Sequence, residues 1–300
     1  MFCGWERRCQ ARMAPLFEQM TIVGVGLIGG SLARAARRRG LVSRFVGAGR
    51  GARNLERALA LGVVDRLETD HRAAVRDSDL VVVGTPVQAA VEVVRNILPA
   101  MRPGAILTDV GSVKGPFVRA VEEMDRGEVR FLGGHPIAGT EESGVEASFA
   151  ELFEGRRTIL TPTSRTIPGV VDALRAFWEG VGARVDVLSP EAHDRILADI
   201  SHLPHLVAYA LVDCALKGEG LPYAAGGFRD FTRIASSNPE MWREICLDNR
   251  EALLAALRGF EESLAALRGA VEREDGQALE RVFRRAKEGR DGWLQDMGWA

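Results

Sequence analysis

The chain has 300 residues, of which 46% are apolar and 27% are charged, and its formal net charge is −2. This composition is ordinary for a globular protein with a sizeable core, and the near-zero charge gives no electrostatic reason for a nucleic-acid or anionic-membrane partner. The four cysteines form no CxxC pair and have no histidines at metal-ligand spacing, which argues against a zinc site. No apolar run is long enough to span a membrane. We therefore expect a soluble, cytoplasmic protein without a metal ion.

The first nineteen residues contain Arg7, Arg8 and Arg12 but no continuous apolar stretch, which argues against a secretory signal. We expect residues 1–19 to be a disordered extension, or to precede a true start at Met13. An arginine-bearing organelle-targeting segment is the less favoured alternative, because the stretch is poor in serine.

Short apolar runs alternate with helical patterns from residue 20 onward. Strands are expected at 20–25, 45–48, 80–84, 105–109, 131–132, 158–161 and 184–188, with helical composition at 31–39 and 54–61. Strands that are apolar throughout and separated by helices are typical of a parallel, doubly wound sheet. The sequence therefore predicts an α/β fold, with an N-terminal Rossmann domain over residues 20–188 built on a mostly parallel sheet.

The pattern changes near residue 190. Residues 189–191 and 238–240 each carry the signature of a helix start, an N-cap followed by proline and an acid. Strand patterns do not recur after this point, and large apolar residues recur at helical spacing over 253–267. The sequence predicts an all-helical C-terminal domain over residues 189–300. Its long apolar helix needs either the first domain or a second subunit as a partner, and we favour a homodimer.

The most informative segment is the glycine turn Gly24-Val25-Gly26-Leu27-Ile28-Gly29, which follows a strand pattern and precedes a helical one. Gly24 permits the tight turn, Gly26 lets the backbone approach a pyrophosphate, and Gly29 lets the helix lie close to the strand. The helix N-terminus, with Leu27 and Ile28, offers unpaired N–H groups and a positive partial charge to the phosphates. In this context the turn predicts a site for a nicotinamide dinucleotide.

The end of the second strand bears on the choice between NAD and NADP. An NAD-selective site places an acid there to bind the ribose 2′-hydroxyl, whereas this chain has Gly49 followed by Arg50, with Arg53 nearby. A guanidinium binds a 2′-phosphate through charge-assisted hydrogen bonds. The sequence therefore favours NADP over NAD, unless both arginines are simply solvated loop residues.

Two further strand ends contribute candidates at the same edge, where ligands lie in open α/β sheets. Thr85 and Pro86 follow one strand, and Asp109, Gly111 and Ser112 follow the next. We expect Gly111 and Ser112 to approach the nicotinamide ring.

Histidine is scarce, with five in the chain, and its positions are informative. His135 lies after two glycines and before Pro136, which disfavours helical geometry at His135 and fixes its direction. A histidine held beside a nicotinamide pocket is a natural proton acceptor near neutral pH. His202 and His205 flank Pro204 in a helix that the proline should kink. Taken alone, each of these histidines is more often a hydrogen-bonded structural residue than a catalyst.

Five segments together carry a resemblance to a known family. They are Gly24-x-Gly26-x-x-Gly29, Asp109-Val-Gly-Ser112-Val-Lys114, Gly134-His135-Pro136-Ile-Ala-Gly139-Thr140-Glu141, Ser201-His-Leu-Pro-His205 and Gly226-Gly-Phe-Arg-Asp-Phe-Thr-Arg233-Ile-Ala235. In this order they closely resemble the prephenate/arogenate (cyclohexadienyl) dehydrogenases of tyrosine biosynthesis, over about residues 20–267. The resemblance implies oxidation of prephenate to 4-hydroxyphenylpyruvate, or of arogenate to tyrosine, with loss of carbon dioxide. It also implies a Rossmann domain followed by a helical dimerisation domain.

The resemblance implies a role for each matching residue. His135 matches the catalytic histidine, which accepts the proton of the ring hydroxyl while hydride leaves for the nicotinamide. Ser112 matches a serine that orients His135 or the nicotinamide. Arg233 matches the arginine that binds a substrate carboxylate, and a bidentate guanidinium suits that group. Further candidate residues around the substrate are Arg229, His202, His205, Trp242 and Glu141. Arg229 is equally compatible with a surface ion pair, and Glu141 either orders the loop after His135 or discriminates between substrates.

Two alternatives remain beside this hypothesis. One is another Rossmann oxidoreductase with a helical dimer domain, of the 3-hydroxyacid dehydrogenase or pyrroline-carboxylate reductase kind, which would not need His135 or the segment 228–233. The other is a non-catalytic dinucleotide-sensing protein, which would not need Ser112, His135 and Arg233 together. The sequence does not decide between prephenate and arogenate, because the two substrates differ only in the side chain.

Overall fold

A computed structural model of the chain describes residues 14–140 and 142–298. The predicted extension over residues 1–19 lies outside the described residues up to position 13, and its end, from Phe17, already belongs to the first strand. The contacts between residues divide the chain into two compact units that meet at Arg250 and Glu251. Each unit is described separately below.

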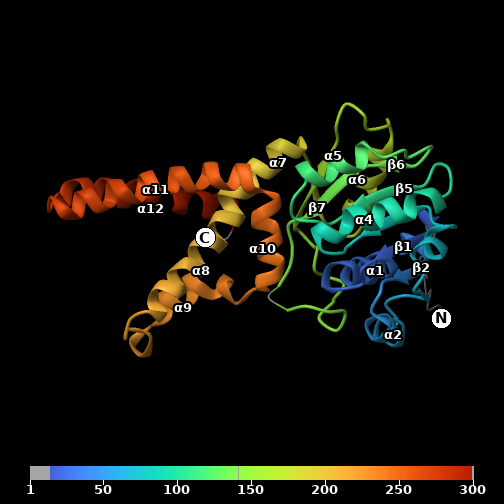
Figure 1. The fold of residues 1–300 in the computed structure, drawn as a ribbon, viewed down its shortest axis with the longest axis horizontal. Helices are drawn as coiled ribbons and strands as arrows, with labels where there is room; N and C mark the ends of the chain where they lie inside the picture. The colour runs from blue at the N-terminus through green and yellow to red at the C-terminus, as the bar shows by residue number, and fades with distance from the viewer. Residues whose placement is uncertain (1–13, 141, 299–300) are drawn as a thin grey trace, which may run out of the picture. The chain divides into compact units, whose positions relative to one another are not determined.

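The first unit is built on a parallel sheet of six strands in the order β3-β2-β1-β4-β5-β6 (Figure 1). The strands are β1 (Phe17–Val23), β2 (Val42–Ala48), β3 (Arg66–Glu68), β4 (Leu80–Val83), β5 (Ile106–Asp109) and β6 (Arg130–Phe131). Every neighbouring pair runs parallel. The strand order reverses between β1 and β4, which is the topological switch point of a doubly wound sheet. The structure thus confirms the predicted Rossmann fold, with β3 as an additional short strand.

A second, smaller sheet follows in the chain. It contains β7 (Gly133–Pro136), β8 (Arg157–Thr161) and β9 (Arg184–Val187), with β7 antiparallel to β8 and β8 parallel to β9. The register pairs His135 with Ile159, so the candidate catalytic histidine has the extended geometry that Pro136 indicated, in a strand that the sequence did not predict. β7 also packs against β5 of the first sheet.

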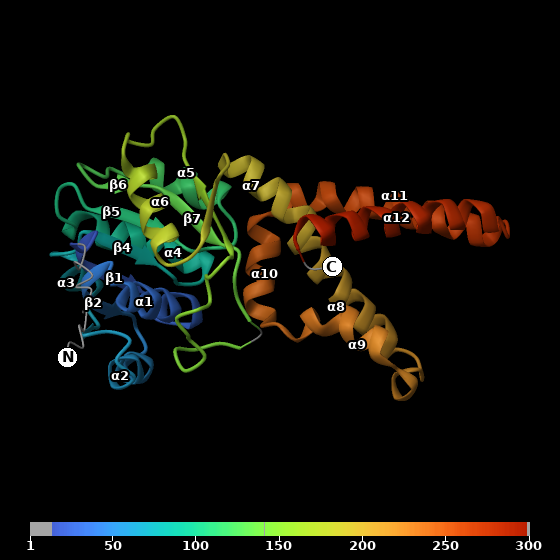
Figure 2. The ribbon, with the colours of Figure 1, turned by 180° about the vertical axis from the view of Figure 1, so that it is seen from behind.

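Helices cover both faces of the parallel sheet (Figure 2). They are α1 (Leu27–Arg39), α2 (Ala52–Ala60), α3 (His71–Val75), α4 (Val87–Ile97), α5 (Gly115–Glu122) and α6 (Val170–Gly180). One apolar core joins α1, α2 and α6 to the sheet and contains the fully buried Trp178 and Phe45. A second core joins α3, α4 and α5 to the opposite face. Burial on both faces explains why β4 reads as a continuous apolar run.

The described residues that follow β9 in the first unit form only helices and turns. The helices are α7 (Pro190–Leu197), the π-helical segment η2 (Ala198–His202), α8 (Leu203–Leu216), the 3-10 segment η3 (Leu221–Tyr223), α9 (Gly226–Thr232), η4 (Arg233–Ser236) and α10 (Pro239–Asp248). Ser189 and Asn238 cap α7 and α10 through their side chains, as predicted. The π-helical segment η2 directly precedes the first turn of α8, which contains Pro204. Within this unit α7 packs against α5 and α10 against α4.

The second unit is a pair of long helices, α11 (Arg250–Glu272) and α12 (Gly276–Asp296). Asp275 caps α12 by accepting a hydrogen bond from the Ala278 amide. Large apolar side chains remain exposed on both helices, among them Phe260, Leu264 and Phe283. The apolar stripe predicted over 253–267 is therefore only partly covered within a single chain.

The glycine turn between β1 and α1 has the geometry that the sequence indicated. Gly24 has φ +96°, and a Cβ atom there would lie 2.7 Å from the backbone of Gly84 at the end of β4. At Gly29 a Cβ atom would lie 2.7 Å from the Ile22 side chain of β1, so the helix and the strand are in close contact. Gly26 is the N-cap of α1 and faces open space.

These contacts predict how substitutions at glycines with positive φ affect stability. Gly24→Ala should lower the free energy of unfolding by about 2–3 kcal/mol, because the new methyl group meets backbone atoms as well as an unfavourable φ. Gly40→Ala is the matched control, because Gly40 has φ +66° but no atom near its Cβ position. Gly40→Ala should lower the free energy of unfolding by only about 1 kcal/mol. Urea unfolding of both variants checks this, and equal losses would contradict the proposed clash.

Candidate active site

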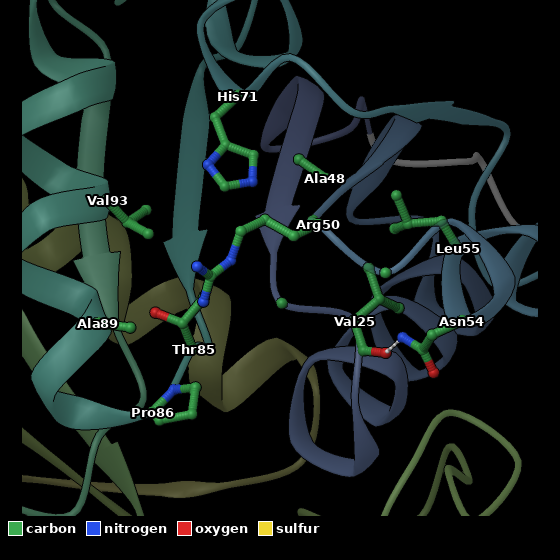
Figure 3. Close-up of a pocket in the computed structure, with 13 residues that line it drawn as sticks. Val25, Ala48, Arg50, Asn54, Leu55, His71, Thr85, Pro86, Ala89 and Val93 are labelled. Atoms are coloured by element: carbon green, nitrogen blue, oxygen red, sulfur yellow. Dashed lines mark hydrogen bonds between the residues drawn. The ribbon is translucent and has the colours of Figure 1, made fainter.

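The carboxyl ends of β1, β2 and β4 surround a pocket at one edge of the parallel sheet (Figure 3). Gly24 and Val25 come from the glycine turn, Gly49 and Arg50 follow β2, and Thr85 follows β4. Pro86, also in the lining, is the N-cap of α4. The pocket thus unites three of the strand ends at which the sequence predicted cofactor residues. Its position at the switch point is where open α/β sheets bind their ligands.

Arg50, His71 and Thr85 give the pocket a polar character. Figure 3 shows Arg50 reaching across the pocket between His71 and Thr85. No carboxylate of the described residues pairs with Arg50. The Nε2 atom of His71 and the Oγ1 atom of Thr85 are buried and lack a hydrogen-bond partner within the described parts of the chain. Buried polar atoms of this kind are normally hydrogen-bonded, so both fit a pocket that receives a polar ligand.

The second part of the site is the strand β7. Its two glycines are required for close packing, since a Cβ atom at Gly133 would lie 2.6 Å from Thr161 Oγ1 and one at Gly134 would lie 3.0 Å from the Asp109 carbonyl oxygen. β7 can therefore pass directly against the end of β5. His135 follows the glycines and is 9% exposed.

A buried ion pair fixes β7 to the loop after β5. The fully buried Lys114 ammonium bonds the Asp109 carboxylate and donates to the Gly134 carbonyl oxygen at 2.8 Å. Asp109 also accepts hydrogen bonds from the Gly134 amide at 3.2 Å and the Gly111 amide at 2.8 Å. Burial lowers the pKa of Lys114, and the Asp109 charge opposes that effect. The Asp109 carboxylate is thus occupied by groups of the protein that position the strand of His135.

His135 is in turn held by a residue from α7. The Nδ1 atom of His135 lies 2.8 Å from Nε2 of His193, and Nδ1 of His193 lies 2.8 Å from Oδ1 of Asp194. The Asp194 carboxylate also accepts the backbone amides of Lys114 at 2.8 Å and Gly115 at 2.7 Å. His193 is fully buried and Asp194 is 7% exposed. A line of three side chains therefore runs from the candidate base into the protein.

Burial dominates the protonation states of this group. It places the pKa of His135 well below its ordinary value, and the nearby charges of His193 and Lys114 act in the same direction. Burial also lowers the pKa of His193, against the effect of its hydrogen bond to Asp194. For Asp194 burial alone would raise the pKa, but the hydrogen bonds from His193 and the two backbone amides lower it overall. At neutral pH both histidines are neutral and Asp194 is a carboxylate.

A third buried histidine, His202, lies at the end of η2. The Nδ2 group of Asn249 lies 3.0 Å from its Nδ1 atom and also donates to the Asp194 carbonyl oxygen at 2.8 Å. Burial lowers the pKa of His202 to about 4, so the ring is neutral. Since Nδ1 accepts from Asn249, the ring proton is on Nε2. That Nε2–H has no partner within the described residues.

Trp242 from α10 completes this cluster. Its ring stacks on His205 with centroids 3.6 Å apart and meets His202 edge-on at 6.0 Å. The indole N–H of Trp242 is buried and, within the described residues, has no acceptor. The structure thus brings together three of the predicted substrate residues, and His202 is close enough to His135 to affect its pKa.

Other predicted site residues are placed less centrally. Ser112 is half-buried in the loop after β5, and Arg53 is exposed on α2. Arg229 is exposed and forms an ion pair with Asp230 at 3.1 Å, the alternative that its sequence context left open. Arg233 is exposed at the start of η4, which packs against α8. Glu141 lies outside the described residues.

The sequence-based prediction did not include His71, His193, Asp194, Lys114 and Asn249. Lys114 stands in the segment that resembles the family, and its distance of five residues from Asp109 was a usable signal. His193 and Asp194 lie in the first turns of a predicted helix, where charged residues are common and carry no motif. Only the packing of α7 against α5 gives them a partner.

A glycine turn at the switch point of a doubly wound sheet, together with a buried histidine on a strand that packs against β5, is typical of dinucleotide-dependent dehydrogenases. The comparisons with known proteins identify the family. Residues 32–187 match the nucleotide-binding domain of prephenate dehydrogenase, and residues 189–285 match the dimerization domain of prephenate dehydrogenase.

Relatives and solved structures agree. The chain is 36% identical over 283 residues to a cyclohexadienyl dehydrogenase of Zymomonas mobilis, covering 92% of this chain and 96% of the relative. A crystal structure of A. aeolicus prephenate dehydrogenase in complex with hydroxyphenyl propionate and NAD+ has a TM-score of 0.87 and 39% identity, covering 92% of this chain and 98% of that one. Synechocystis arogenate dehydrogenase has a TM-score of 0.79 and 31% identity, covering 92% and 99%.

The chain therefore belongs to the prephenate dehydrogenase family, and it is an NAD(P)-dependent dehydrogenase. The resemblance found in the sequence is confirmed. The two alternatives, another Rossmann oxidoreductase and a non-catalytic sensor, are not supported by these matches. In the part of the chain that the structure describes, no helix is both long and apolar enough to cross a membrane.

The neutral state of His202 predicts a loss of stability in acid. Its pKa is about 4 in the folded protein against 6.5 ordinarily, so the unfolded chain binds a proton that the folded chain does not between those values. Stability is therefore full above about pH 6.5 and falls as the pH is lowered, by about 2 kcal/mol at pH 5 from this group. Urea unfolding at about pH 7 and at pH 5 measures this loss of stability.

His202→Gln removes the titrating group, so its free energy of unfolding should fall less between about pH 7 and pH 5 than that of the wild type. The difference should be about 2 kcal/mol, whatever the variant's stability at neutral pH. The same pH dependence in both proteins would contradict the buried neutral state.

Proposed function

We propose that this enzyme oxidises prephenate, arogenate or both, producing 4-hydroxyphenylpyruvate or tyrosine with loss of carbon dioxide. The observation that carries the proposal is the neutral, buried state of His135. Its ring is hydrogen-bonded to His193, and its strand, β7, packs against β5 of the nucleotide-binding sheet. The named relatives support the substrate class, because they are cyclohexadienyl, prephenate and arogenate dehydrogenases. The nicotinamide dinucleotide supplies the hydride acceptor when it is bound.

His135 is the proposed base. Its Nδ1 atom is bound to His193, which leaves Nε2 to accept the hydrogen bond of the ring hydroxyl. As the alcohol carbon loses hydride, Nε2 takes the hydroxyl proton and the carbonyl forms. The ring carboxylate then leaves as carbon dioxide, the electron pair of the broken C–C bond completes the aromatic ring, and the resulting phenolate oxygen takes the proton back from His135. The aromatic product makes the reaction effectively irreversible.

The substrate carries two carboxylates and needs donors. Two buried N–H groups are available, Nε2 of His202 and Nε1 of Trp242, neither of which has an acceptor within the described residues. Binding a carboxylate would satisfy both. We assign Arg233 to the second carboxylate by its match to the family segment, and Ser112 to orientation of His135 or the nicotinamide ring. Arg229, His205 and Glu141 remain secondary candidates.

We propose that the enzyme prefers NADP to NAD. Gly49 stands at the end of β2 in place of an acid, and Arg50 reaches into the pocket beside the unpartnered Nε2 atom of His71. Both side chains suit the 2′-phosphate of NADP, which needs cations and hydrogen-bond donors. The A. aeolicus complex holds NAD+, so it supports the dinucleotide site, and the preference depends on Arg50 and His71.

We further propose a homodimer formed through the helical segment. Residues 189–285 match the family's dimerization domain, and large apolar side chains such as Phe260, Leu264 and Phe283 are exposed in the single chain. Large apolar side chains that are exposed in a single chain favour association with a second subunit.

The proposed reaction is tested by mixing the purified enzyme with prephenate or arogenate and with NAD or NADP, and following the absorbance of the reduced nicotinamide. At least one of the four combinations should turn over. His135→Asn should lower kcat at least about 100-fold, while the Kd for the dinucleotide stays within about 2-fold, because His135 is not part of the pocket lining. Near-normal turnover by this variant would remove His135 from the mechanism.

The cofactor preference is tested at Arg50. Arg50→Ala should raise the KM for NADP about 10-fold or more and leave that for NAD within about 2-fold, because one charge-assisted bond to the 2′-phosphate contributes about 1.5–3 kcal/mol. Arg53→Ala is the matched control on the neighbouring helix and should change both much less. Equal effects of Arg50→Ala on the two cofactors would refute the preference.

A further inference from the structure

The line His135–His193–Asp194 links the candidate base to a buried carboxylate through two hydrogen bonds of 2.8 Å each. The proposed step uses His193 only to occupy Nδ1 of His135, and it does not use Asp194. They are adjacent in α7, and their side chains point toward β7 and toward the loop before α5. Their geometry determines which nitrogen of each imidazole carries a proton.

The proton positions follow from the carboxylate outward. Asp194 is ionised and accepts hydrogen bonds only, so Nδ1 of His193 must carry a proton and donate it to Oδ1. In the neutral ring Nε2 of His193 is then an acceptor, and Nδ1 of His135 must donate to it. The neutral His135 ring is left with an unprotonated Nε2. This is the state that a base facing the substrate requires.

Resting on the proposed function, we propose that His193 and Asp194 hold His135 in its acceptor tautomer and then receive its proton during the reaction. When the substrate O–H bond breaks, a new N–H bond forms at Nε2 of His135. The N–H bond at Nδ1 of His135 then breaks, and its proton forms a new N–H bond at Nε2 of His193. The positive charge moves from His135 to His193, which is hydrogen-bonded to the Asp194 carboxylate. His193 is a positioning and relay residue that does not touch the substrate.

The surroundings favour the charge on His193 over His135. Lys114 disfavours a positive charge on either ring, but the carboxylates of Asp194, which bonds His193 directly, and Asp109 favour it on His193, whereas no carboxylate does so on His135. Lys114 is itself paired with Asp109, and the remaining titratable neighbour, His202, is neutral. Since His193 is fully buried, the proton stays within the His135–His193 pair until it returns through Nε2 of His135 to the phenolate oxygen of the product.

The relay predicts a graded effect of substitutions at His193. His193→Leu removes both functions and should lower kcat about 100-fold or more, with KM for the substrate within about 3-fold. His193→Gln can still accept the proton of His135 Nδ1 and donate to Asp194, but its amide cannot take up a proton. It should keep part of the activity, with kcat lowered about 10-fold.

A solvent isotope measurement distinguishes proton transfer to His193 from a role of His193 in positioning His135 alone. In mixtures of H2O and D2O, kcat of the wild type should depend on deuterium content with curvature, because two protons move. His193→Gln should give a straight line, because only one proton moves. Ser78→Ala is the control for loss of a buried hydrogen bond: Ser78 is fully buried and bonds Gln19 and Thr21, so its loss should lower stability while the curvature remains. Full kcat in His193→Gln, or an unchanged curve, would overturn the relay.

The tautomers can be read without turnover. In protein labelled with 15N-histidine, nitrogen shifts and N–H couplings should show His135 and His193 both protonated at Nδ1 and unprotonated at Nε2 at neutral pH. A proton on Nε2 of His135 would overturn the inference, even if the enzyme is active. If the wild type turned over neither prephenate nor arogenate, the proposed function would fail. The nitrogen shifts would still test the tautomers of His135 and His193 independently.

Discussion

The site depends on one buried carboxylate, that of Asp194. It accepts hydrogen bonds from the amides of Lys114 and Gly115 and from the ring of His193. Removing a carboxylate from water is costly, and three charge-assisted hydrogen bonds of about 1.5–3 kcal/mol each offset that cost. The same contacts join α7, after the last strand, to the start of α5 at the carboxyl edge of the parallel sheet. The helical segment is thereby held against the edge where the dinucleotide binds.

A second buried charge completes the support. Asp109 and Lys114 pair inside the protein and between them bond both backbone groups of Gly134. His135 is therefore fixed through its backbone by one ion pair and through its ring by the His193–Asp194 link. Burial that would make an isolated charge unstable keeps the histidine neutral, and a neutral imidazole is what proton abstraction requires. Stability and catalysis thus depend on the same low-dielectric surroundings.

Much of the fold could be predicted from the sequence, because β4 is apolar throughout, β1 and β5 are largely apolar, and the glycine turn is local. β3 could not, since Arg66-Leu67-Glu68 is too short to show a pattern. β7 was also missed as a strand, because Gly133 and Gly134 disfavour strands in isolation and are needed here only for packing against Asp109 and Thr161.

The residues of the candidate site could likewise be predicted only in part. His135, His202 and His205 could be chosen from the sequence because they lie in segments that resemble the family. His193 could not, because its importance arises from the approach of α7 to β7, two elements that are 58 residues apart at the bonded histidines. Long-range contacts of this kind leave no spacing to recognise. The motifs likewise did not indicate that the side chains of Arg229 and Arg233 are exposed.

The central claim is that the network behind His135 presents its Nε2 atom to the reacting hydroxyl beside the bound dinucleotide. A crystal structure of the enzyme with NADP and a phenolic product analogue tests this most directly. We expect the phenol oxygen within about 3 Å of His135 Nε2, with the bond from Nδ1 to His193 intact. A phenol oxygen bound by another side chain, or a His135 ring turned away from His193, would contradict the account.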